Sequence, residues 1–302
     1  MNSVVIENIS KSYGDVIAVD DISLTIEKGE IFGFIGPDGS GKTTLFRMLT
    51  TLLIPDKGKT TVEGYDVVKD FKKIRLITGY MPGRFSLYQD LTVEENLNFF
   101  ASVFGTTIQA NYNLIIDIYV MLEPFKNRKA GKLSGGMKQK LALCCALIHK
   151  PEILFLDEPT TGVDPVSRNE FWDMLGNLRK EGITIVVSTP YMDEASECDR
   201  VALIQKGKIM ETDYLKNILG RYPRRIFSVK SDIMYTLLND LRNYEFAHSV
   251  FSFGDSLHYT DSRVDVNSNN VLEYLKSKEH TNIIINEIEP NIEDCFMDLM
   301  SK

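Results

Sequence analysis

The sequence is poor in the residues that support several common kinds of site. Its 302 residues include one tryptophan, four histidines and four cysteines. The cysteines lie at positions 144, 145, 198 and 295, a spacing that matches no zinc site, and adjacent Cys144 and Cys145 are typical of packing residues. No run of 18 apolar residues occurs, and the N-terminus has no signal-peptide pattern, so we expect no membrane span and a reducing, cytoplasmic location.

Charge and composition also limit the choice of partners. The formal net charge of −8 argues against a general nucleic-acid surface. The 43% hydrophobic content and the length are enough for one large domain and one small domain. The sequence has no internal repeat and no low-complexity linker.

The clearest motif is a glycine-rich segment that follows an apolar run at residues 30–35. It reads GPDGSGKTT over residues 36–44 and precedes a helix-forming stretch from Thr44 to Leu53. This strand–loop–helix order predicts a phosphate-binding loop, because glycines let backbone N–H groups turn inward onto phosphate oxygens. Lys42 then reaches the β- and γ-phosphates, and the Thr43 hydroxyl ligates Mg²⁺.

An acidic pair follows a second apolar run. Ile153–Leu156 has the character of a strand buried on both faces of a parallel sheet, and Asp157-Glu158 comes directly after it. The carboxyl ends of such strands are where α/β sheets bind ligands. We therefore expect Asp157 to hold Mg²⁺ through water and Glu158 to polarise a water for attack on the γ-phosphate.

A third motif indicates the family. Leu133-Ser-Gly-Gly-Met137 resembles the LSGGQ signature of ATP-binding cassette (ABC) ATPases, and Ser134 has the position of a helix cap. With the two earlier motifs in this order, the stretch from about Val4 to Lys216 is identified as a member of that family. The ending Glu289-Pro-Asn-Ile-Glu-Asp-Cys-Phe-Met297 resembles the C-terminal tail of the bacterial drug- and polysaccharide-export type, and the expectation of export rests on this tail. The residues expected to bind ATP are Tyr13, Gly36, Pro37, Asp38, Gly39, Ser40, Gly41, Lys42, Thr43 and Thr44.

The resemblance implies further roles. Tyr13 matches the aromatic residue on which adenine stacks, and Asp164 ends a segment that resembles the family's D-loop. In the family, the signature of one subunit closes on the nucleotide of the other, so Ser134, Gly135 and Gly136 are expected to act across a head-to-tail dimer. The resemblance also implies ATP and Mg²⁺ as ligands, a separate integral-membrane permease as partner, contacted through about residues 80–97, and a peripheral position on the cytoplasmic face of the membrane.

Three positions depart from the family's pattern. Gly83 stands where the family has a glutamine that links Mg²⁺ and the attacking water to the permease, and Pro190 stands where it has a histidine that orients the water. The proline has no side-chain donor that could replace the histidine. Arg84, Thr189 and Tyr191 are the candidate substitutes for the missing side chains. Asp38 stands where asparagine is commoner. We expect ATP binding to be retained and hydrolysis to be slow.

The expected fold is an α/β P-loop NTPase (ABC ATPase) core with an antiparallel β subdomain, a helical subdomain and a small α+β ferredoxin-like C-terminal domain. The ATP-binding domain is placed at residues 1–220, with its helical subdomain at about 85–150, and the C-terminal domain at 221–302. The latter has the predicted order β-α-β-β-α-β and a final helix at Ile292–Met300. Its role stays open between regulation, dimer stabilisation and passive packing.

Two functions compete. The first is the ATP-hydrolysing subunit of an exporter, acting as a homodimer or with a second ABC ATPase, and it draws on the complete motif set with Glu158. The alternative is a hydrolysis-impaired ATP-binding switch that works with a competent partner cassette, favoured by Gly83 and Pro190. A soluble protein acting on ribosomes or DNA is disfavoured, because the chain has one cassette and no coiled-coil insertion.

Overall fold

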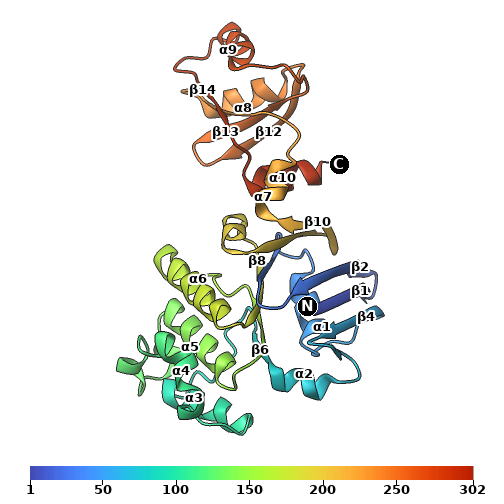
Figure 1. Cartoon of the computed structure of the whole chain (residues 1–302). Coiled ribbons are helices and arrows are strands. Elements are labelled where there is room, and N and C mark those ends of the chain that lie inside the picture. Colours follow the sequence, from blue (N-terminus) through green and yellow to red (C-terminus); the bar gives the residue numbers. More distant parts are fainter. Residues whose placement is uncertain (302) are drawn as a thin grey trace. The chain divides into compact units, whose positions relative to one another are not determined.

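The computed structural model describes residues 1–301 and divides into two compact units, Met1–Leu215 and Lys216–Lys302 (Figure 1). Each unit has its own hydrophobic core. This division reflects which residues pack together. It does not assign a function to either unit, so the placement of an ATP-binding domain at residues 1–220 stays a prediction. No helix among the described residues is long and apolar enough to cross a bilayer.

The first unit is built on a six-stranded sheet with the order β10-β9-β3-β8-β7-β6. Five of these strands run parallel, and β10 pairs antiparallel with β9. The three central strands are buried along their whole length, as their continuous apolar runs predict. The strand bounds are β3 Ile31–Ile35, β6 Thr78–Met81, β7 Ile153–Asp157, β8 Thr184–Thr189, β9 Arg200–Gln205 and β10 Lys208–Tyr214.

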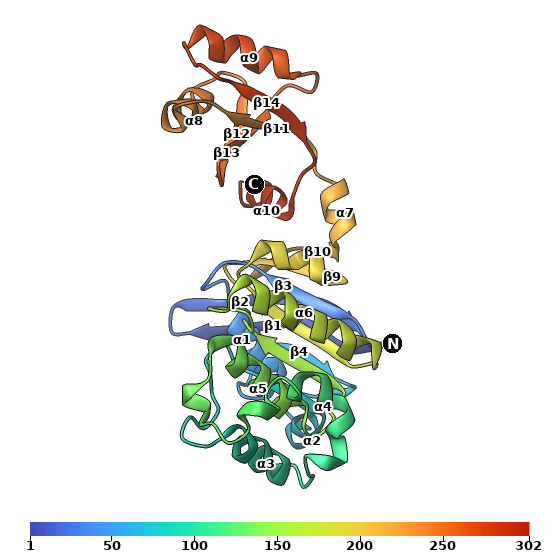
Figure 2. The same cartoon turned by 90° about the vertical axis from the view of Figure 1, so that its left-hand side faces the viewer.

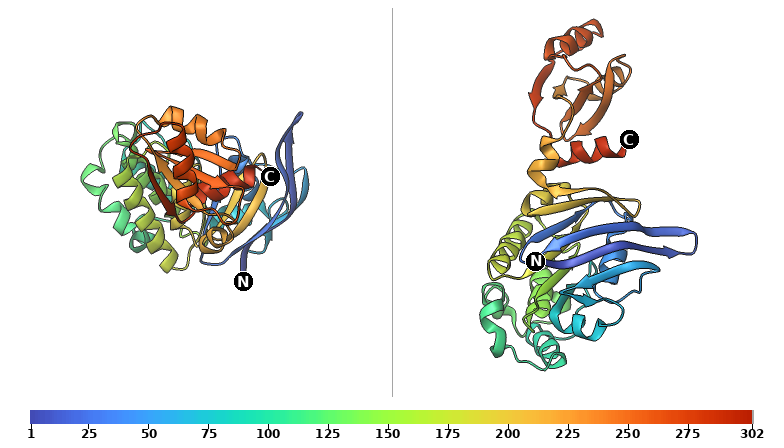
Figure 3. Two further views of the ribbon diagram at one scale, coloured as in Figure 1. Left: turned by 90° about the horizontal axis from the view of Figure 1, so that it is seen from above. Right: turned by 45° about the vertical axis from the view of Figure 1, so that its right-hand side comes forward.

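A second sheet in this unit is antiparallel and has the order β2-β1-β4-β5. Its first two strands form a long hairpin, drawn in blue in Figure 3. The segments 4–9 and 22–27, in which apolar residues alternate with other residues, lie within these two strands, and both strands extend further toward the hairpin turn. The bounds are β1 Asn2–Tyr13, β2 Val16–Glu27, β4 Lys57–Val62 and β5 Tyr65–Asp66.

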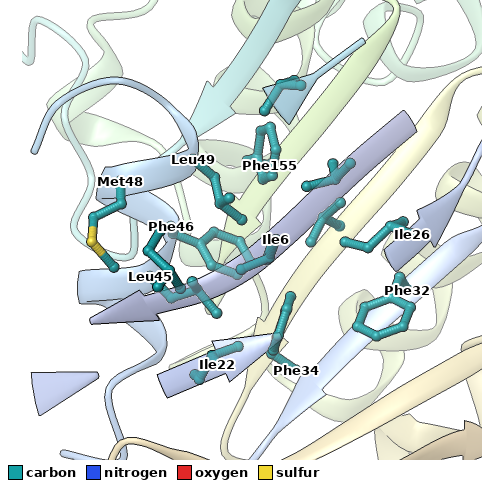
Figure 4. Packing of buried hydrophobic residues seen from close by; sticks show 14 of the residues in the cluster. Ile6, Ile22, Ile26, Phe32, Phe34, Leu45, Phe46, Met48, Leu49 and Phe155 are labelled. Carbon is teal, nitrogen blue, oxygen red and sulfur yellow. The ribbon is translucent and has the colours of Figure 1, made fainter. Parts of the chain in front are cut away.

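The two sheets of this unit enclose a core that also fixes helix α1, Lys42–Leu49. Phe46 on α1 packs edge-on against Phe34 of β3 and Phe155 of β7, with ring centroids 5.9 and 5.8 Å apart (Figure 4). These contacts hold α1, and with it the loop that precedes it, against the carboxyl ends of two parallel strands. The sequence predicts a helix-forming stretch from Thr44 to Leu53. In the structure the helix begins two residues earlier, at Lys42, and ends four residues earlier, at Leu49.

The helices of this unit gather beside the central sheet, with α6 packed against β3 and β8 (Figures 1 and 2). Thr92 and Glu95 form a reciprocal capping box at the start of α3. The helices are α2 Phe71–Ile77, α3 Val93–Val103, α4 Tyr112–Tyr119, α5 Gly135–Leu147 and α6 Pro165–Lys180, with 3₁₀ turns at Gln109–Asn111, Glu123–Phe125, Ala130–Lys132 and Met192–Glu197.

The second unit confirms the predicted ferredoxin-like order. Its sheet has the order β12-β13-β11-β14 and is antiparallel throughout. Helices α8 and α9 contribute to the core on one face of this sheet. The bounds are α7 Leu215–Gly220, β11 Ile226–Lys230, α8 Met234–Arg242, β12 Ala247–Phe253, β13 Ser256–Asp261, α9 Ser268–Ser277, β14 Ile284–Ile288 and α10 Ile292–Met300.

A buried polar contact fastens α10 to this second sheet. On β13, Leu257 and Tyr259 enter the core, so the intervening His258 faces the opposite side. Its Nδ1 lies 2.8 Å from Asp294 Oδ1 on α10. The other oxygen of Asp294 accepts the N–H of Asn291, which begins the helix. One carboxylate therefore both caps α10 and attaches it.

Candidate nucleotide-binding site

The glycine-rich loop follows β3 and packs so closely against neighbouring strands that two of its positions require glycine. A Cβ atom on Gly36 would lie 2.1 Å from the carbonyl oxygen of Ile204, and one on Gly41 would lie 2.2 Å from that of Ala18. Gly41 also has a φ of +108°, in the region that side chains disfavour. The loop thus forms a tight backbone curl at the N-terminus of α1, the geometry that binds phosphate.

Lys42 lies inside this curl, and its side chain is only 3% exposed. Its ammonium donates to the carbonyl oxygens of Gly36 (2.7 Å) and Pro37 (3.0 Å), and it lies 3.5 Å from Glu158 Oε1. Burial lowers the pKa of Lys42, and the carboxylates of Glu158 and Asp38 oppose that shift. A desolvated cation held at the loop is suited to neutralising the terminal phosphates of a nucleotide.

Two adjacent carboxylates end strand β7, as predicted. Asp157 is buried and accepts a hydrogen bond of 2.5 Å from the Ser188 hydroxyl. Glu158 has a φ of +50°, an unusual conformation for a non-glycine residue. Its N–H is held by Ser188, at 3.0 Å from the carbonyl oxygen and 3.1 Å from the hydroxyl. Strained backbone of this kind is concentrated at functional sites, where the surrounding structure enforces it.

A cavity of about 390 Å³ lies at the phosphate loop. It brings together Glu158 and five of the residues expected to bind ATP. Its lining residues are Val16, Ile17, Ala18, Gly39, Gly41, Lys42, Thr43, Thr44, Glu158 and Lys206. Within residues 1–301 the hydroxyl of Ser40, although buried, has no hydrogen-bond partner. The glycine cradle and this orphaned hydroxyl fit a bound polyphosphate, and Thr43 and Asp157 are the residues that would hold Mg²⁺, Asp157 through water.

The structure also adds residues that the sequence motifs did not indicate. Val16, Ile17 and Ala18 reach the cavity from β2, and Val16 pairs across the hairpin with Tyr13. Tyr13 is exposed and is not among the lining residues, and Val16 and Ile17 are exposed apolar residues beside it. The one sequence signal near this wall is Tyr13, which lies three residues before Val16 in the same hairpin.

The signature and D-loop residues lie together at a different place from the cavity lining. Ser134 caps α5 by accepting the N–H of Met137 at 3.3 Å. A Cβ on Gly136 would lie 2.9 Å from Ser167 Oγ, so the signature glycine packs on the start of α6. Asp164 caps that helix by accepting the N–H of Ser167, and this hydrogen bond lowers the pKa of Asp164. Gly135 approaches the same turn, its Cβ position lying 3.4 Å from the Gly162 carbonyl oxygen.

Two of the three departures from the family's pattern, Gly83 and Pro190, lie near the acidic pair. A Cβ on Gly83 would lie 3.0 Å from the carbonyl oxygen of Asp157. Pro190 directly follows β8, whose last residue, Thr189, donates its hydroxyl hydrogen to the buried carboxylate of Glu194. Neither position therefore presents a polar side chain to the site, and the Thr189 hydroxyl is already engaged.

A second buried network supports this region. Glu194 also accepts from the Thr160 hydroxyl at 2.7 Å and lies 3.1 Å from Nε of Arg168. The guanidinium of Arg168 in turn lies 4.5 Å from the ring centre of Tyr191. Glu194 thus joins the segment after Glu158, the segment around Pro190 and helix α6.

A parallel sheet with a glycine loop, a buried lysine and a carboxylate pair at its carboxyl edge defines a P-loop nucleoside triphosphatase. The comparisons specify the family. A family model described as ABC transporter matches residues 19–161. The chain is 32% identical over 310 residues to the linearmycin resistance ATP-binding protein LnrL of Bacillus subtilis, covering 98% of this chain and 97% of LnrL. The chain belongs to the ABC transporter family, whose ATP-binding proteins bind and hydrolyse ATP.

Other relatives agree with this assignment. The chain is 40% identical over 204 residues to the Nod factor export ATP-binding protein I of Burkholderia lata, covering 67% of each chain. It is 48% identical over 198 residues to the probable multidrug ABC transporter ATP-binding protein YbhF of Escherichia coli, covering 65% of this chain and 34% of YbhF. It thus spans about a third of the length of YbhF. The dimeric structure of MJ0796, a bacterial ABC transporter cassette, superposes with a TM-score of 0.64 at 27% identity, covering 70% of this chain and 98% of the cassette.

Proposed function

We propose that this chain is the ATP-hydrolysing subunit of an ABC exporter and that it drives a separate membrane permease from the cytoplasmic face of the membrane. The observation that carries the proposal is the pairing of Lys42 and Glu158 at the cavity of the phosphate loop. Export is suggested by the names of the relatives, which describe a probable multidrug ABC transporter, linearmycin resistance and Nod factor export.

The proposed chemistry follows from the positions of these side chains. Lys42 and the loop N–H groups hold the β- and γ-phosphates, and Thr43 and Asp157 hold Mg²⁺, which supplies charge neutralisation when bound. Glu158 accepts the proton of the attacking water. The hydrogen bond from Ser188 fixes the orientation of Asp157, and the two bonds to the N–H of Glu158 fix the backbone from which its side chain extends.

We propose that turnover is slow. Gly83 supplies no side chain, and Pro190 supplies no donor, so neither can orient the attacking water. Of the candidate substitutes, the hydroxyl of Thr189 is bound to Glu194, and the ring of Tyr191 lies beside the guanidinium of Arg168. Catalysis then depends on Glu158 with less help in placing the water.

We place the chain in a head-to-tail homodimer. The signature residues Ser134, Gly135 and Gly136 and the D-loop Asp164 adjoin one another, and the residues that line the phosphate-loop cavity do not include them. The N-terminal end of α5 presents N–H groups and a partial positive charge, which suits the γ-phosphate of a second subunit's nucleotide. The dimeric cassette among the similar structures supports this arrangement.

We place the permease at a second cavity of about 440 Å³, lined mainly by apolar residues of β6, α3 and α5. Its lining includes the exposed side chains of Leu52, Leu76 and Val103, and also the basic residue Arg75. An apolar hollow with a basic residue fits an amphipathic cytoplasmic helix of the permease. It includes Tyr80 to Pro82, the start of the segment expected to contact the permease, directly before Gly83.

The proposal is tested by Mg²⁺-dependent phosphate release from the purified chain, with K42A as the blank. Turnover above the blank supports the assignment of hydrolysis to this chain. Absence of turnover, both from the chain alone and after co-expression with the genes adjacent to its own, would refute it. Co-purification with membranes that contain the permease tests the coupling separately.

A further inference from the structure

The hairpin turn between β9 and β10 is joined directly to the phosphate loop. Gln205 pairs with Lys208, so the turn consists of Lys206 and Gly207. The N–H of Gly207 donates to the carbonyl oxygen of Ser40 at 2.9 Å, and its carbonyl oxygen accepts the N–H of Asp20 at 2.8 Å. The turn therefore bridges the phosphate loop and strand β2, two segments that both line the cavity.

Packing leaves this turn with one position that can carry a side chain. A Cβ on Gly207 would lie 2.9 Å from the carbonyl oxygen of Ala18, and the residue has a φ of +77°. A Cβ on Gly41 would lie 3.4 Å from the Cα of Gly207. Glycine is thus required at 207, and Lys206 is the residue that the turn presents to the cavity.

The turn geometry does not explain a lysine at position 206. Lys206 has a φ of +48° and Gly207 a φ of +77°, so both turn residues are left-handed. Two-residue hairpins of this kind favour Asn, Asp or Gly at the first position, since these residues tolerate positive φ. A lysine here is disfavoured by the backbone, which points to a use for its side chain.

The charge of Lys206 has no partner within residues 1–301, where it forms neither a hydrogen bond nor an ion pair. Lys208, two residues later, differs in this respect, because its ammonium lies 3.2 Å from Asp20. The other cation of the cavity, Lys42, is bound to the loop carbonyls and to Glu158. Lys206 is therefore the cavity cation that remains available to an anionic ligand.

We propose that Lys206 is a nucleotide-binding residue that donates to a phosphate oxygen of the bound nucleoside polyphosphate, from the wall that β2 and the β9–β10 turn form together. This inference rests on the proposed function, because it assumes a nucleotide in this cavity. It assigns to the turn a second task besides supporting Ser40, and it gives the site a cation in addition to Lys42.

The test compares equilibrium binding of ATP and ADP to the full chain by titration calorimetry. K206M removes the charge and keeps the aliphatic stem, K206R keeps the charge, and K208M is a matched control two residues away. A charge-assisted hydrogen bond at an exposed residue predicts that K206M weakens ATP binding at least about fivefold. K206R and K208M should stay within about twofold of the wild type, a change of ~0.4 kcal/mol.

The outcomes separate this inference from the proposed function. If K42A loses ATP binding and K206M keeps it, the role of Lys206 is refuted and the nucleotide site stands. If K208M weakens binding as much as K206M, the effect is a general loss of positive charge and the contact is refuted. If K206M weakens binding only in step with a lower melting temperature of the nucleotide-free protein, the residue is structural and the inference fails. A wild-type chain that does not bind ATP refutes the proposed function itself.

Discussion

The ammonium of Lys42 and the carboxylate of Glu158 lie 3.5 Å apart, although they belong to segments more than a hundred residues apart in the sequence. Strands β3 and β7 bring them together, each ending at the same edge of the central sheet with β8 between them. The pair places a buried cation and a base at one cavity. In a site without the usual glutamine and histidine, we expect this pair to carry most of the chemistry.

The first prediction concerns the base. E158Q should lower the rate of ATP hydrolysis at least ~100-fold, because the amide cannot accept the proton of the attacking water. ATP binding should persist, since glutamine has nearly the same shape as the glutamate it replaces, and the ATP-bound dimer should accumulate. Phosphate release and light scattering with ATP measure the two effects.

A matched control for E158Q lies at the other end of strand β7. Glu152 precedes β7 and forms an exposed ion pair with Lys28 at 3.3 Å. E152Q should leave turnover within about twofold of the wild type, because exposed pairs of this kind contribute less than ~1 kcal/mol. Equal turnover in E158Q and E152Q would remove Glu158 from the mechanism.

The second prediction concerns the position after β8. P190H supplies the imidazole that the family has there, and we expect turnover to rise about tenfold, the effect of ~1.4 kcal/mol from a hydrogen bond to a charged oxygen. P190A removes the proline ring without adding a donor and should not raise turnover. The measurement is the steady-state rate at saturating ATP. An equal gain in both variants would show that the backbone, and not the missing imidazole, limits the rate.

Local pattern predicted the parts of the site that are contiguous in the sequence. The phosphate loop, the cap at Ser134 and the carboxylates after β7 each depend on neighbours within a few residues, and the structure has all three in the expected elements. The order of the C-terminal unit was predicted for the same reason. The helix after the loop ends at Leu49 and not at the expected Leu53, because the chain leaves the helical conformation at Thr51, which has a φ of +64°.

Contacts between distant segments could not be predicted. Val16 and Lys206 reach the cavity only because the β1–β2 hairpin and the β9–β10 turn meet the phosphate loop. Glu194 lies in an ordinary polar stretch of the sequence, and its three partners come from three other positions along the chain. Nothing in the local spacing of these residues indicates that they would be buried together.

The third prediction concerns this buried carboxylate. Glu194 is 2% exposed and binds the hydroxyls of Thr160 and Thr189 and the guanidinium of Arg168. E194A leaves two buried hydroxyls without their acceptor and leaves Arg168 with Asp193 as its remaining carboxylate partner, so we expect the free energy of unfolding to fall by about 3 kcal/mol. Glu197 is exposed in the same segment, and E197A should change it by less than ~0.5 kcal/mol. Urea titration measures the free energy of unfolding of both variants. If E194A lowers it no more than E197A does, the network contributes no stability.

The fourth prediction concerns stability at low pH. His149 stacks on Phe104 with ring centroids 3.8 Å apart, and its Nε2 lies 3.1 Å from the carbonyl oxygen of Thr78. Burial lowers the pKa of His149 below its usual 6.5, and the contact with Thr78 opposes the shift. The unfolded chain therefore binds a proton on this histidine at a higher pH than the folded chain does. Its contribution to stability must fall as the pH drops below about 6.5.

Melting temperatures at pH 7.5 and pH 5.5 test this. We expect the wild type to lose more stability between these values than H149F, which keeps the stacked ring and cannot be protonated. H149F also loses the contact with Thr78, so its melting temperature at pH 7.5 should be lower than that of the wild type, and the two curves should converge as the pH falls. Parallel curves would mean that His149 titrates alike in the folded and unfolded chain, contrary to the effect of its burial.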